Sequence, residues 1–408
     1  MQARTAEAGG TAVYSATDTR DAAGRIVQTT CSVEGESHTW AFTCDDAGRL
    51  TQVTRDGTPV HIHQYGPTGP SGTITATYDD RDRLVQYGNT DYTYNAAGDL
   101  TQTSGPQGTT SYDYDAFGNL RGATQPDGTK ITYVIDGENR RVGKKVDGTL
   151  EQGWLYQDGL NPVAQTDGQG NVTERFVYGT KPNVPAYMIK DGTTYRFITD
   201  PRGSVRLVVN ADTGEIAQRI DYSPFGKVVN DTNPGFQPFG FAGGLYDLDT
   251  GLVRFGARDY DPETGRWTAK DPIGFLGGTA NLYQYAVTDP VNYLDLSGND
   301  PALVCGAIVV AAVAYLSWDF YHNRVEAVHK IEKAKEINRA AGNALKTGEY
   351  SDYARLSYDA SLRTLEAARA ATRAGLSVPG TFASGPVPTN ALDAAVSGAT
   401  AAAQSAAQ

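Results

Sequence analysis

The 408-residue sequence has few of the residues that crosslink small domains or bind metal ions, since it contains three Cys and five His. Three Cys are too few for the disulfide scaffold of a small secreted domain. Cys31 and Cys44 flank a candidate hairpin, so they form either a cross-strand disulfide or, as we favour, two separate thiols. His61 and His63 share one face of a candidate strand but lack a third ligand. We therefore expect no metal and no cofactor.

The N-terminus and the charge distribution also lack common targeting and binding signals. The opening "MQARTAEAGGTAVYSA" has no apolar run of signal-peptide length, so it predicts no classical export signal. Residues 300–408 contain ten acids and ten Lys or Arg, which places the whole net charge of −12 in residues 1–299. An acidic body without a basic stripe argues against a nucleic-acid partner. Because Met1 falls within a repeat pattern, we expect a fragment, or the downstream end, of a longer polypeptide.

Residues 1–299 show no convincing helical pattern, and the chain is rich in turn and aromatic residues, with 46 Gly and 24 Tyr. A motif of alternating aromatic residues, an Asp-x-x-Gly turn and a closing aliphatic residue recurs instead. Its copies are "DTRDAAGRI" (18–26), "AFTCDDAGRL" (41–50), "ATYDDRDRL" (76–84), "YTYNAAGDL" (92–100), "YDYDAFGNL" (112–120) and "YVIDGENRRV" (133–142). The closing aliphatic residues are 24, 34, 16, 20 and 22 residues apart, which indicates a repeat array.

Each repeat has the sequence features of a β-hairpin. Alternating Tyr-x-Tyr places the rings on one face of a strand. The Asp side chain caps backbone N–H groups of the turn, and the Gly accepts a positive φ. Because a single hairpin cannot bury its aromatic face, the hairpins must join a larger sheet. We predict one long all-β array over residues 1–299.

The composition changes after residue 299. Residues 301–318 are an uncharged run rich in Ala and Val, at the length threshold for crossing a ~30 Å hydrocarbon core. Helical patterns follow within residues 324–375, and a Gly-, Pro- and Ala-rich tail over residues 378–408 is expected to be disordered. We predict a small α-helical region over residues 300–377. Its apolar run fits membrane insertion and a buried helix equally well, and no nuclease, ADP-ribosyltransferase or deaminase signature is present.

The repeats resemble the YD repeats of the Rhs family, which includes bacterial Rhs effectors, the C components of insecticidal toxin complexes and the shell of teneurins. Residues 254–298, "RFGARDYDPETGRWTAKDPIGFLGGTANLYQYAVTDPVNYLDLSG", are similar to the Rhs-associated core that closes such shells. The resemblance implies a mainly β fold, with a partial shell of spiralling hairpins over residues 1–250 and the core over residues 251–299. It also implies that the shell cavity holds a C-terminal toxin, which an autoproteolytic site in the core severs.

The core contains carboxylates and an arginine that suit aspartyl-type self-cleavage. In this chemistry one carboxylate acts as a base on water while a second, protonated carboxyl polarises the scissile carbonyl. Similarity to the toxin-complex C components implies Arg258, Asp259 and Asp271 as the catalytic residues. Similarity to the Rhs effectors implies Asp271 and Asp295 instead. The competing interpretation is an ordinary turn without catalysis, in which Arg266 or Arg258 pairs with Asp261.

The predicted cleavage region departs from the family pattern. The usual ending is Asp-Pro-x-Gly-Leu, whereas this chain reads "DLSGN", with Leu296 in place of Pro and Asn299 in place of Leu. The resemblance implies a cut just after Asn299, in the region of Gly298, Asn299 and Asp300. The departure puts the scissile bond, rather than the catalytic carboxylates, in question.

We predict an Rhs-type effector whose β-shell encapsulates a membrane-active C-terminal cargo and releases it by Asp-dependent self-cleavage near residue 299. Expected partners are this cargo, a cognate immunity protein, a secretion-system spike or chaperone and a membrane. Specialised secretion or a place in the cell envelope is expected, with membrane association through residues 301–318. The alternatives are a non-catalytic surface or adhesion protein anchored by that run, and an orphan shell remnant without activity.

Overall fold

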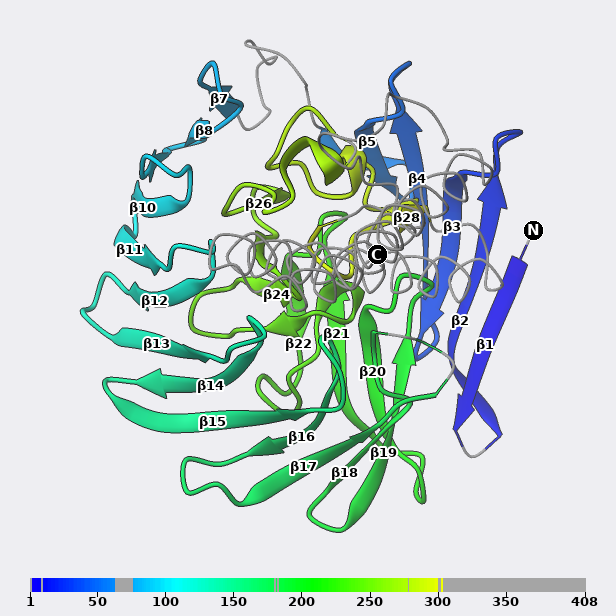
Figure 1. The fold of residues 1–408 in the computed structure, drawn as a ribbon. Helices are drawn as coiled ribbons and strands as arrows, with labels where there is room; N and C mark the ends of the chain where they lie inside the picture. Colours follow the sequence, from blue (N-terminus) through cyan, green and yellow to red (C-terminus); the bar gives the residue numbers. More distant parts are fainter. Residues whose placement is uncertain are drawn as a thin grey trace, which may run out of the picture. The chain divides into compact units, whose positions relative to one another are not determined.

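The computed structural model describes residues 2–8, 10–62, 76–179, 181, 183–277, 279–299 and 302–303. Residues 1–314 form one compact unit, in which nearly all regular structure is antiparallel β-sheet (Figure 1). The first sheet has six strands in chain order. They are β1 (Gln2–Ala8), β2 (Thr11–Arg20), β3 (Ile26–Val33), β4 (Glu36–Cys44), β5 (Leu50–Arg55) and β6 (Thr58–Ile62).

The second sheet has sixteen strands, again in chain order. Its first eight are β7 (Ala76–Tyr78), β8 (Leu84–Tyr87), β9 (Thr90–Tyr94), β10 (Leu100–Gly105), β11 (Gly108–Tyr114), β12 (Leu120–Thr124), β13 (Lys130–Ile135) and β14 (Arg141–Val146). Its last eight are β15 (Thr149–Tyr156), β16 (Pro162–Thr166), β17 (Val172–Val177), β18 (Tyr187–Lys190), β19 (Thr193–Thr199), β20 (Val205–Asn210), β21 (Ile216–Tyr222) and β22 (Val228–Asp231). Neighbours in the sheet are neighbours in sequence, so the predicted array of hairpins is confirmed.

Residues 236–299, here called the closing segment, contain only short elements. They are η1 (Phe241–Gly243), β23 (Leu245–Tyr246), β24 (Val253–Phe255), β25 (Arg258–Asp261), β26 (Arg266–Trp267), η2 (Gly274–Gly277), η3 (Ala286–Thr288) and β27 (Tyr293–Leu294). Strands β23 to β26 form a four-stranded sheet, and β27 pairs with β28 (Ala302–Leu303).

Two kinds of turn recur between the strands. In the predicted Asp-x-x-Gly turn, Asp21 Oδ1 accepts hydrogen bonds from the N–H groups of Ala23 and Arg25, both at 2.9 Å, and Asp21 Oδ2 pairs with the Arg25 guanidinium at 2.7 Å. The same contacts recur in the turns that begin at Asp45, Asp79 and Asp136. The other kind is a tight turn such as Asp147 and Gly148, with φ of +48° and +84°. Two positive φ values are typical of two-residue hairpin turns.

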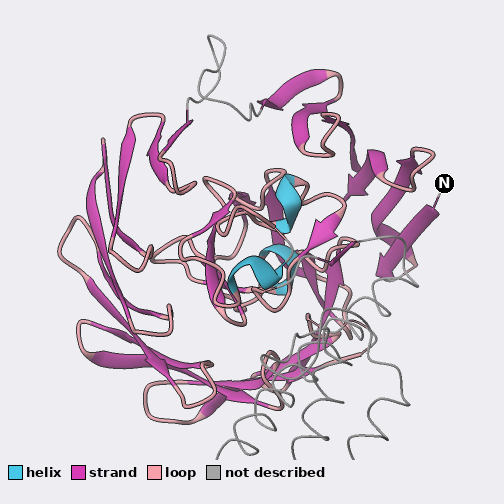
Figure 2. Ribbon diagram, turned by 45° about the horizontal axis from the view of Figure 1, so that its top comes forward, coloured by secondary structure: helices cyan, strands magenta, loops and turns pink. Residues whose placement is uncertain are grey.

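The two edges of the array have different surroundings. Alternate turns lie on the same edge of each sheet, because consecutive strands are antiparallel. The short helices of the closing segment lie inside the curve of the strands (Figure 2). On one edge the array is joined to the closing segment by hydrogen bonds from Ile26 N to Asn292 Oδ1 (2.6 Å), Tyr283 Oη to Gly98 O (2.7 Å) and Tyr260 Oη to Phe225 O (2.7 Å). On the other edge, a Cβ placed on Gly57 or Gly148 would meet no atom of the described residues within 4 Å. The other edge also has a contact with the closing segment, because Gln125 Nε2 in the turn between β12 and β13 donates to Asp249 O at 2.9 Å.

The largest hydrophobic cluster joins the second sheet to the closing segment. The sheet contributes Phe176, Met188, Phe197, Val208 and Tyr222, among others, and the closing segment contributes Phe239, Phe241, Phe255, Tyr260, Trp267 and Tyr285. The rings of Tyr260 and Tyr285 lie 4.3 Å apart between centroids. Since each fully buried side chain of this size contributes about 1.5–3 kcal/mol, the closing segment is part of the core of the unit.

These findings confirm a mainly β fold for the described residues. Cys31 and Cys44 are free thiols, as we favoured. The predicted helical region (300–377) and tail (378–408) lie outside the described residues, except that Ala302–Leu303 form a strand where a helix was expected. The described part of the chain contains no helix that is long and apolar enough to cross a membrane.

Candidate active site

Arg258, at the start of β25, is the centre of a buried polar cluster. Its side chain is 3% exposed, and its Nη2 atom lies 2.8 Å from Asp271 Oδ2 and 3.2 Å from Asp295 Oδ2. Its Nε atom donates to the carbonyl oxygen of Gly298, and its Nη1 atom donates to Leu282 O at 3.2 Å. The guanidinium also lies over the ring of Trp267, at 4.2 Å from the centroid. Such a set of contacts fixes the orientation of the guanidinium plane.

Asp271 combines turn chemistry with the contact to Arg258. Its Oδ1 atom accepts a hydrogen bond from Ile273 N at 3.0 Å, and its backbone carbonyl accepts one from Gly274 N at 2.9 Å. Its backbone N–H donates to Leu282 O at 3.0 Å, the same carbonyl that Arg258 contacts. The carboxylate is therefore fixed by its own turn and turned toward Arg258.

Asp295 follows β27 and holds the segment that comes after it. Its Oδ1 atom accepts hydrogen bonds from Asn299 N at 3.0 Å and from Ser297 Oγ at 3.3 Å. Its Oδ2 atom faces Arg258, and its side chain is 2% exposed. Burial and then the nearby negative charge of Asp295 raise the pKa of Tyr285. One oxygen of the Asp295 carboxylate thus contacts the predicted cleavage region, and the other oxygen contacts Arg258.

The chain over residues 297–299 is tightly placed. Ala257 N donates to Ser297 O at 2.9 Å, which joins this segment to the turn between β24 and β25. Gly298 has a φ of +73°, and a Cβ placed on it would lie 2.5 Å from Phe255 O. A side chain at this position would be strained in its backbone conformation and would also collide with the neighbouring strand.

Asp259 belongs to a different network from Asp271. Its Oδ1 atom accepts from Arg141 at 2.7 Å and its Oδ2 atom from Arg254 at 2.9 Å, with all three side chains no more than 3% exposed. Burial lowers the pKa of Arg254, against the attraction of Asp259. Adjacent residues of a strand point to opposite faces, which explains why Arg258 and Asp259 separate. Of the two predicted residue sets, the structure brings together Arg258, Asp271 and Asp295 and places Asp259 elsewhere.

Within the described residues, Asp261 forms no ion pair with Arg258 or with Arg266, the two partners of the alternative interpretation. Asp261 accepts hydrogen bonds from Glu263 N at 2.9 Å and from Thr264 Oγ1 at 2.8 Å. Burial raises the pKa of Asp261. Of the predicted cleavage residues, Gly298 and Asn299 contact the cluster, whereas Asp300 lies outside the described residues.

Sequence reasoning missed several residues that shape the site. Leu282 contributes a backbone carbonyl and Ser297 a small hydroxyl, and neither residue belongs to a distinctive sequence pattern.

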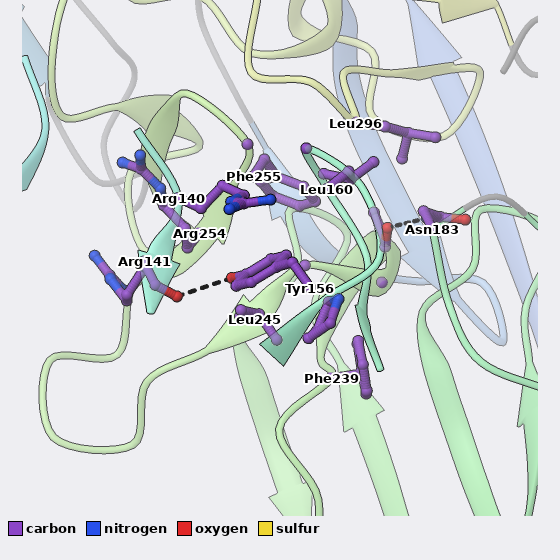
Figure 3. A pocket seen from close by; sticks show the side chains of 16 residues that line it. Arg140, Arg141, Tyr156, Leu160, Asn183, Phe239, Leu245, Arg254, Phe255 and Leu296 are labelled. Carbon is purple, nitrogen blue, oxygen red and sulfur yellow. Dashed lines mark hydrogen bonds between the residues drawn. The ribbon is translucent and has the colours of Figure 1, made fainter. Parts of the chain in front are cut away.

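Leu296 lines a cavity of about 20 Å³ together with Leu160, Leu245 and Phe255 (Figure 3). The cavity has room for about one water molecule, so the segment before Gly298 is closely packed. No group of His, Cys, Asp or Glu within the described ranges is placed to hold a metal ion.

The sequence of this chain is similar to that of the teneurins. The family model of the teneurin YD-shell matches residues 1–291. Human teneurin-4 is 29% identical over 267 residues, which cover 62% of this chain and 10% of that protein. Chicken (Gallus gallus) teneurin-1 is 33% identical over 229 residues, covering 55% of this chain and 8% of that protein.

A bacterial relative and a solved structure are also similar. The tRNA3(Ser)-specific nuclease WapA of Bacillus spizizenii is 27% identical over 190 residues, which cover 45% of this chain and 8% of that protein. The crystal structure of TcdB2-TccC3-TEV aligns over 70% of this chain and 18% of that chain, with 17% identity and a TM-score of 0.40. The chain therefore spans about a tenth of the length of the curated relatives it matches.

Proposed function

Because the chain belongs to the teneurin YD-shell family, as the predicted resemblance implied, we propose that it is a segment of a toxin-type shell that cuts its own chain. In this proposal residues 1–299 form the shell segment and its closure, and the region after the cut is the cargo. The name of the relative WapA, a tRNA-specific nuclease, supports a toxin-type role in general. The proposed cleavage site is the cluster of Arg258, Asp271 and Asp295.

One observation carries the proposal: a single buried guanidinium contacts two carboxylates and a backbone carbonyl. Arg258 contacts Asp271, Asp295 and Gly298 O. A cation that donates to a carbonyl oxygen stabilises the negative charge that develops there during hydrolysis, and its effect is strongest where water is excluded. A carboxylate beside it is placed to take a proton from an attacking water. Carbonyl, cation and base are the groups that peptide hydrolysis requires.

The positive charge of Arg258 changes the expected division of roles between the carboxylates. In the dyad predicted from the sequence the two carboxyls share one proton, because like charges repel. Here both carboxylates contact the same nitrogen, Arg258 Nη2, which offsets their repulsion. We therefore assign the base to Asp271 and the positioning of the cleavage segment to Asp295.

The proposal is tested by the mass of the full-length protein after incubation. We expect the purified chain to convert to two pieces that separate near residue 299. Asp271→Asn should remain at full mass, because an amide cannot take the proton from water. Asp261→Asn is the matched control, since Asp261 is a partly buried carboxyl at the end of β25 that lies outside the Arg258 cluster. A wild-type chain that stays intact would rule out self-cleavage, and a cut Asp271→Asn chain would remove Asp271 from the mechanism.

A second candidate function is a non-catalytic surface or adhesion protein. The observation that favours it is that Asp271 and Asp295 both cap their own turns, through Ile273 N and Asn299 N. Turn capping alone is a sufficient structural role for an aspartate. An uncut wild-type chain together with destabilised Asp271→Asn and Asp295→Asn variants would favour this function.

The expectations about delivery remain proposals. They are secretion by a specialised route or a place in the cell envelope, an immunity protein, a spike or chaperone, and a membrane contacted through residues 301–318. The membrane expectation concerns residues that lie outside the described part of the chain, apart from Ala302–Leu303. A cavity of about 540 Å³ between residues 235–249 and strands β14 to β17, β21 and β22 has the size of a small-molecule site rather than of a folded domain. We therefore propose that this chain contributes the closing end of a shell rather than the whole enclosure.

A further inference from the structure

The peptide that links Gly298 to Asn299 is held at both of its polar atoms. Arg258 Nε donates to the carbonyl oxygen of Gly298, and the Asn299 N–H donates to Asp295 Oδ1 at 3.0 Å. We propose that this peptide, rather than the one after Asn299, is the bond that is cut. The inference rests on the proposed self-cleavage, and it moves the cut one residue toward the N-terminus from the position that the family pattern implies.

On the carbonyl side, Arg258 is fixed before any reaction begins. Its other nitrogens are occupied by Asp271, Asp295 and Leu282 O, and its plane lies over Trp267. The Arg258 guanidinium therefore does not have to reorient when negative charge develops on the Gly298 oxygen. Preorganised donors of this kind are the main source of rate in peptide hydrolysis.

On the amine side, Asp295 contacts the nitrogen that would leave. Its Oδ1 atom accepts from Asn299 N, and its Oδ2 atom contacts Arg258. A carboxylate at this position stabilises the positive charge that the nitrogen acquires when it becomes an amine. Asp295 and Arg258 thus contact the two ends of the same peptide.

The backbone around the bond is also held in place. The φ of +73° at Gly298 and the close approach of Phe255 O leave room for glycine alone. The hydrogen bond from Ala257 N to Ser297 O fixes the preceding residue at 2.9 Å. Holding the reacting groups in one geometry removes much of the entropic part of the barrier.

The reaction balances with water as the co-reactant. Asp271 takes one proton from water, and the water oxygen bonds to the Gly298 carbonyl carbon while the C=O electron pair moves onto the oxygen beside Arg258. The oxygen then restores the C=O bond and the C–N bond breaks. The nitrogen takes the proton back from Asp271, which leaves a carboxyl group on Gly298 and an amine on Asn299. Asp271 ends as the carboxylate it was, and no oxidant or metal is required.

The two neighbouring bonds are distinguished by N-terminal sequencing and denaturing mass measurement of the purified full-length chain after incubation. We expect the released piece to begin with Asn299 and the other piece to end with Gly298. A released piece that begins with Asp300 would overturn the inference and leave the proposed self-cleavage intact. A chain that stays whole would remove both, because no bond would then be cut.

Two variants test the roles assigned to the ends of the bond. Arg258→Met should slow cleavage by about 10²–10³-fold, the usual effect of losing one oxyanion donor. Asn299→Leu, which restores the residue of the family pattern, keeps the backbone N–H and should still be cut after Gly298. If Asn299→Leu is cut one residue later, the side chain at position 299 selects the bond, and the contacts of Arg258 and Asp295 with the Gly298–Asn299 peptide do not. Since Arg258→Met also leaves two buried carboxylates without this cation, a circular dichroism spectrum matching wild type is required before its rate is interpreted.

Discussion

At the scale of single residues, Arg258 and Asp259 are neighbours in sequence that serve different networks. The sequence motif identified Arg258, Asp271 and Asp295, because all three lie in one quoted stretch of the closing segment. It did not reveal that Asp259 pairs with Arg141, which lies 118 residues earlier. A contact at that separation depends on the fold of the array and leaves no local pattern.

Asp259→Asn is expected to destabilise the protein rather than to act on the cut bond. The substitution leaves Arg141 and Arg254 buried without their shared carboxylate, and breaking a buried ion pair costs about 3–5 kcal/mol. Urea unfolding followed by tryptophan fluorescence measures this loss, in an Asp271→Asn background so that cleavage does not interfere.

The control for this prediction is Asp261→Asn on the same strand. Burial already disfavours the charged form of Asp261 and raises its pKa, so removing the charge should change the free energy of unfolding little. Equal losses for Asp259→Asn and Asp261→Asn would contradict the role assigned to the two arginines.

At the scale of elements, the turns were the most predictable part of the fold. The Asp-x-x-Gly turns form from contacts within five residues, such as those of Asp21 with Ala23 and Arg25, so the sequence alone specifies them. The sequence did not predict which turns contact the closing segment. That depends on the antiparallel order of the strands and on the position of residues 236–299, neither of which is encoded within one repeat.

Two glycine substitutions separate the cost of the turn from the cost of contact with the closing segment. Gly148 and Gly226 both have positive φ, at +84° and +91°. A Cβ on Gly148 would meet nothing within 4 Å among the described residues, whereas one on Gly226 would lie 2.2 Å from Phe241 Cγ. Gly148→Ala should therefore lower the free energy of unfolding only by the cost of holding alanine at a positive φ, about 1–2 kcal/mol.

Gly226→Ala should cost clearly more than Gly148→Ala, because Phe241 is a buried core residue that cannot move without opening a cavity. The measurement is the urea midpoint of each variant beside wild type. If the two variants unfold at the same midpoint, the turn at Gly226 is not packed against the closing segment as described.

At the scale of the whole molecule, several carboxylates are held in their charged form by the fold. Although burial opposes it, the attraction of Lys144 and Arg141 lowers the pKa of Asp247 below 3.8. Against the same opposing burial, Arg202 lowers the pKa of Asp200. A carboxyl whose pKa is lower in the folded chain adds stability above its unfolded pKa and loses it as the pH falls further.

We therefore expect the melting temperature to fall as the pH drops below about 3.8, the unfolded value for Asp. Asp261 and Asp289 have raised pKa values and act in the opposite direction, but the carboxyls with lowered pKa values outnumber them. Thermal unfolding between pH 6 and pH 3 measures the effect, and Asp247→Asn should show a shallower decline. A melting temperature that is constant or rises over this range would show that the ion pairs of these carboxylates do not carry net stability.

The pairing of β27 with β28 has a consequence for what a cut would release. Tyr293 pairs with Leu303 and Leu294 with Ala302, so the bond between Gly298 and Asn299 lies in the loop of a small hairpin. Hydrolysis there converts one chain into a nicked complex, because the new ends are still joined by backbone hydrogen bonds. Departure of the second piece is then a dissociation that depends on dilution, whereas the cut itself does not. Under the proposed self-cleavage, the cut and the departure of the second piece would be separate events, and the cut would be complete before the second piece leaves.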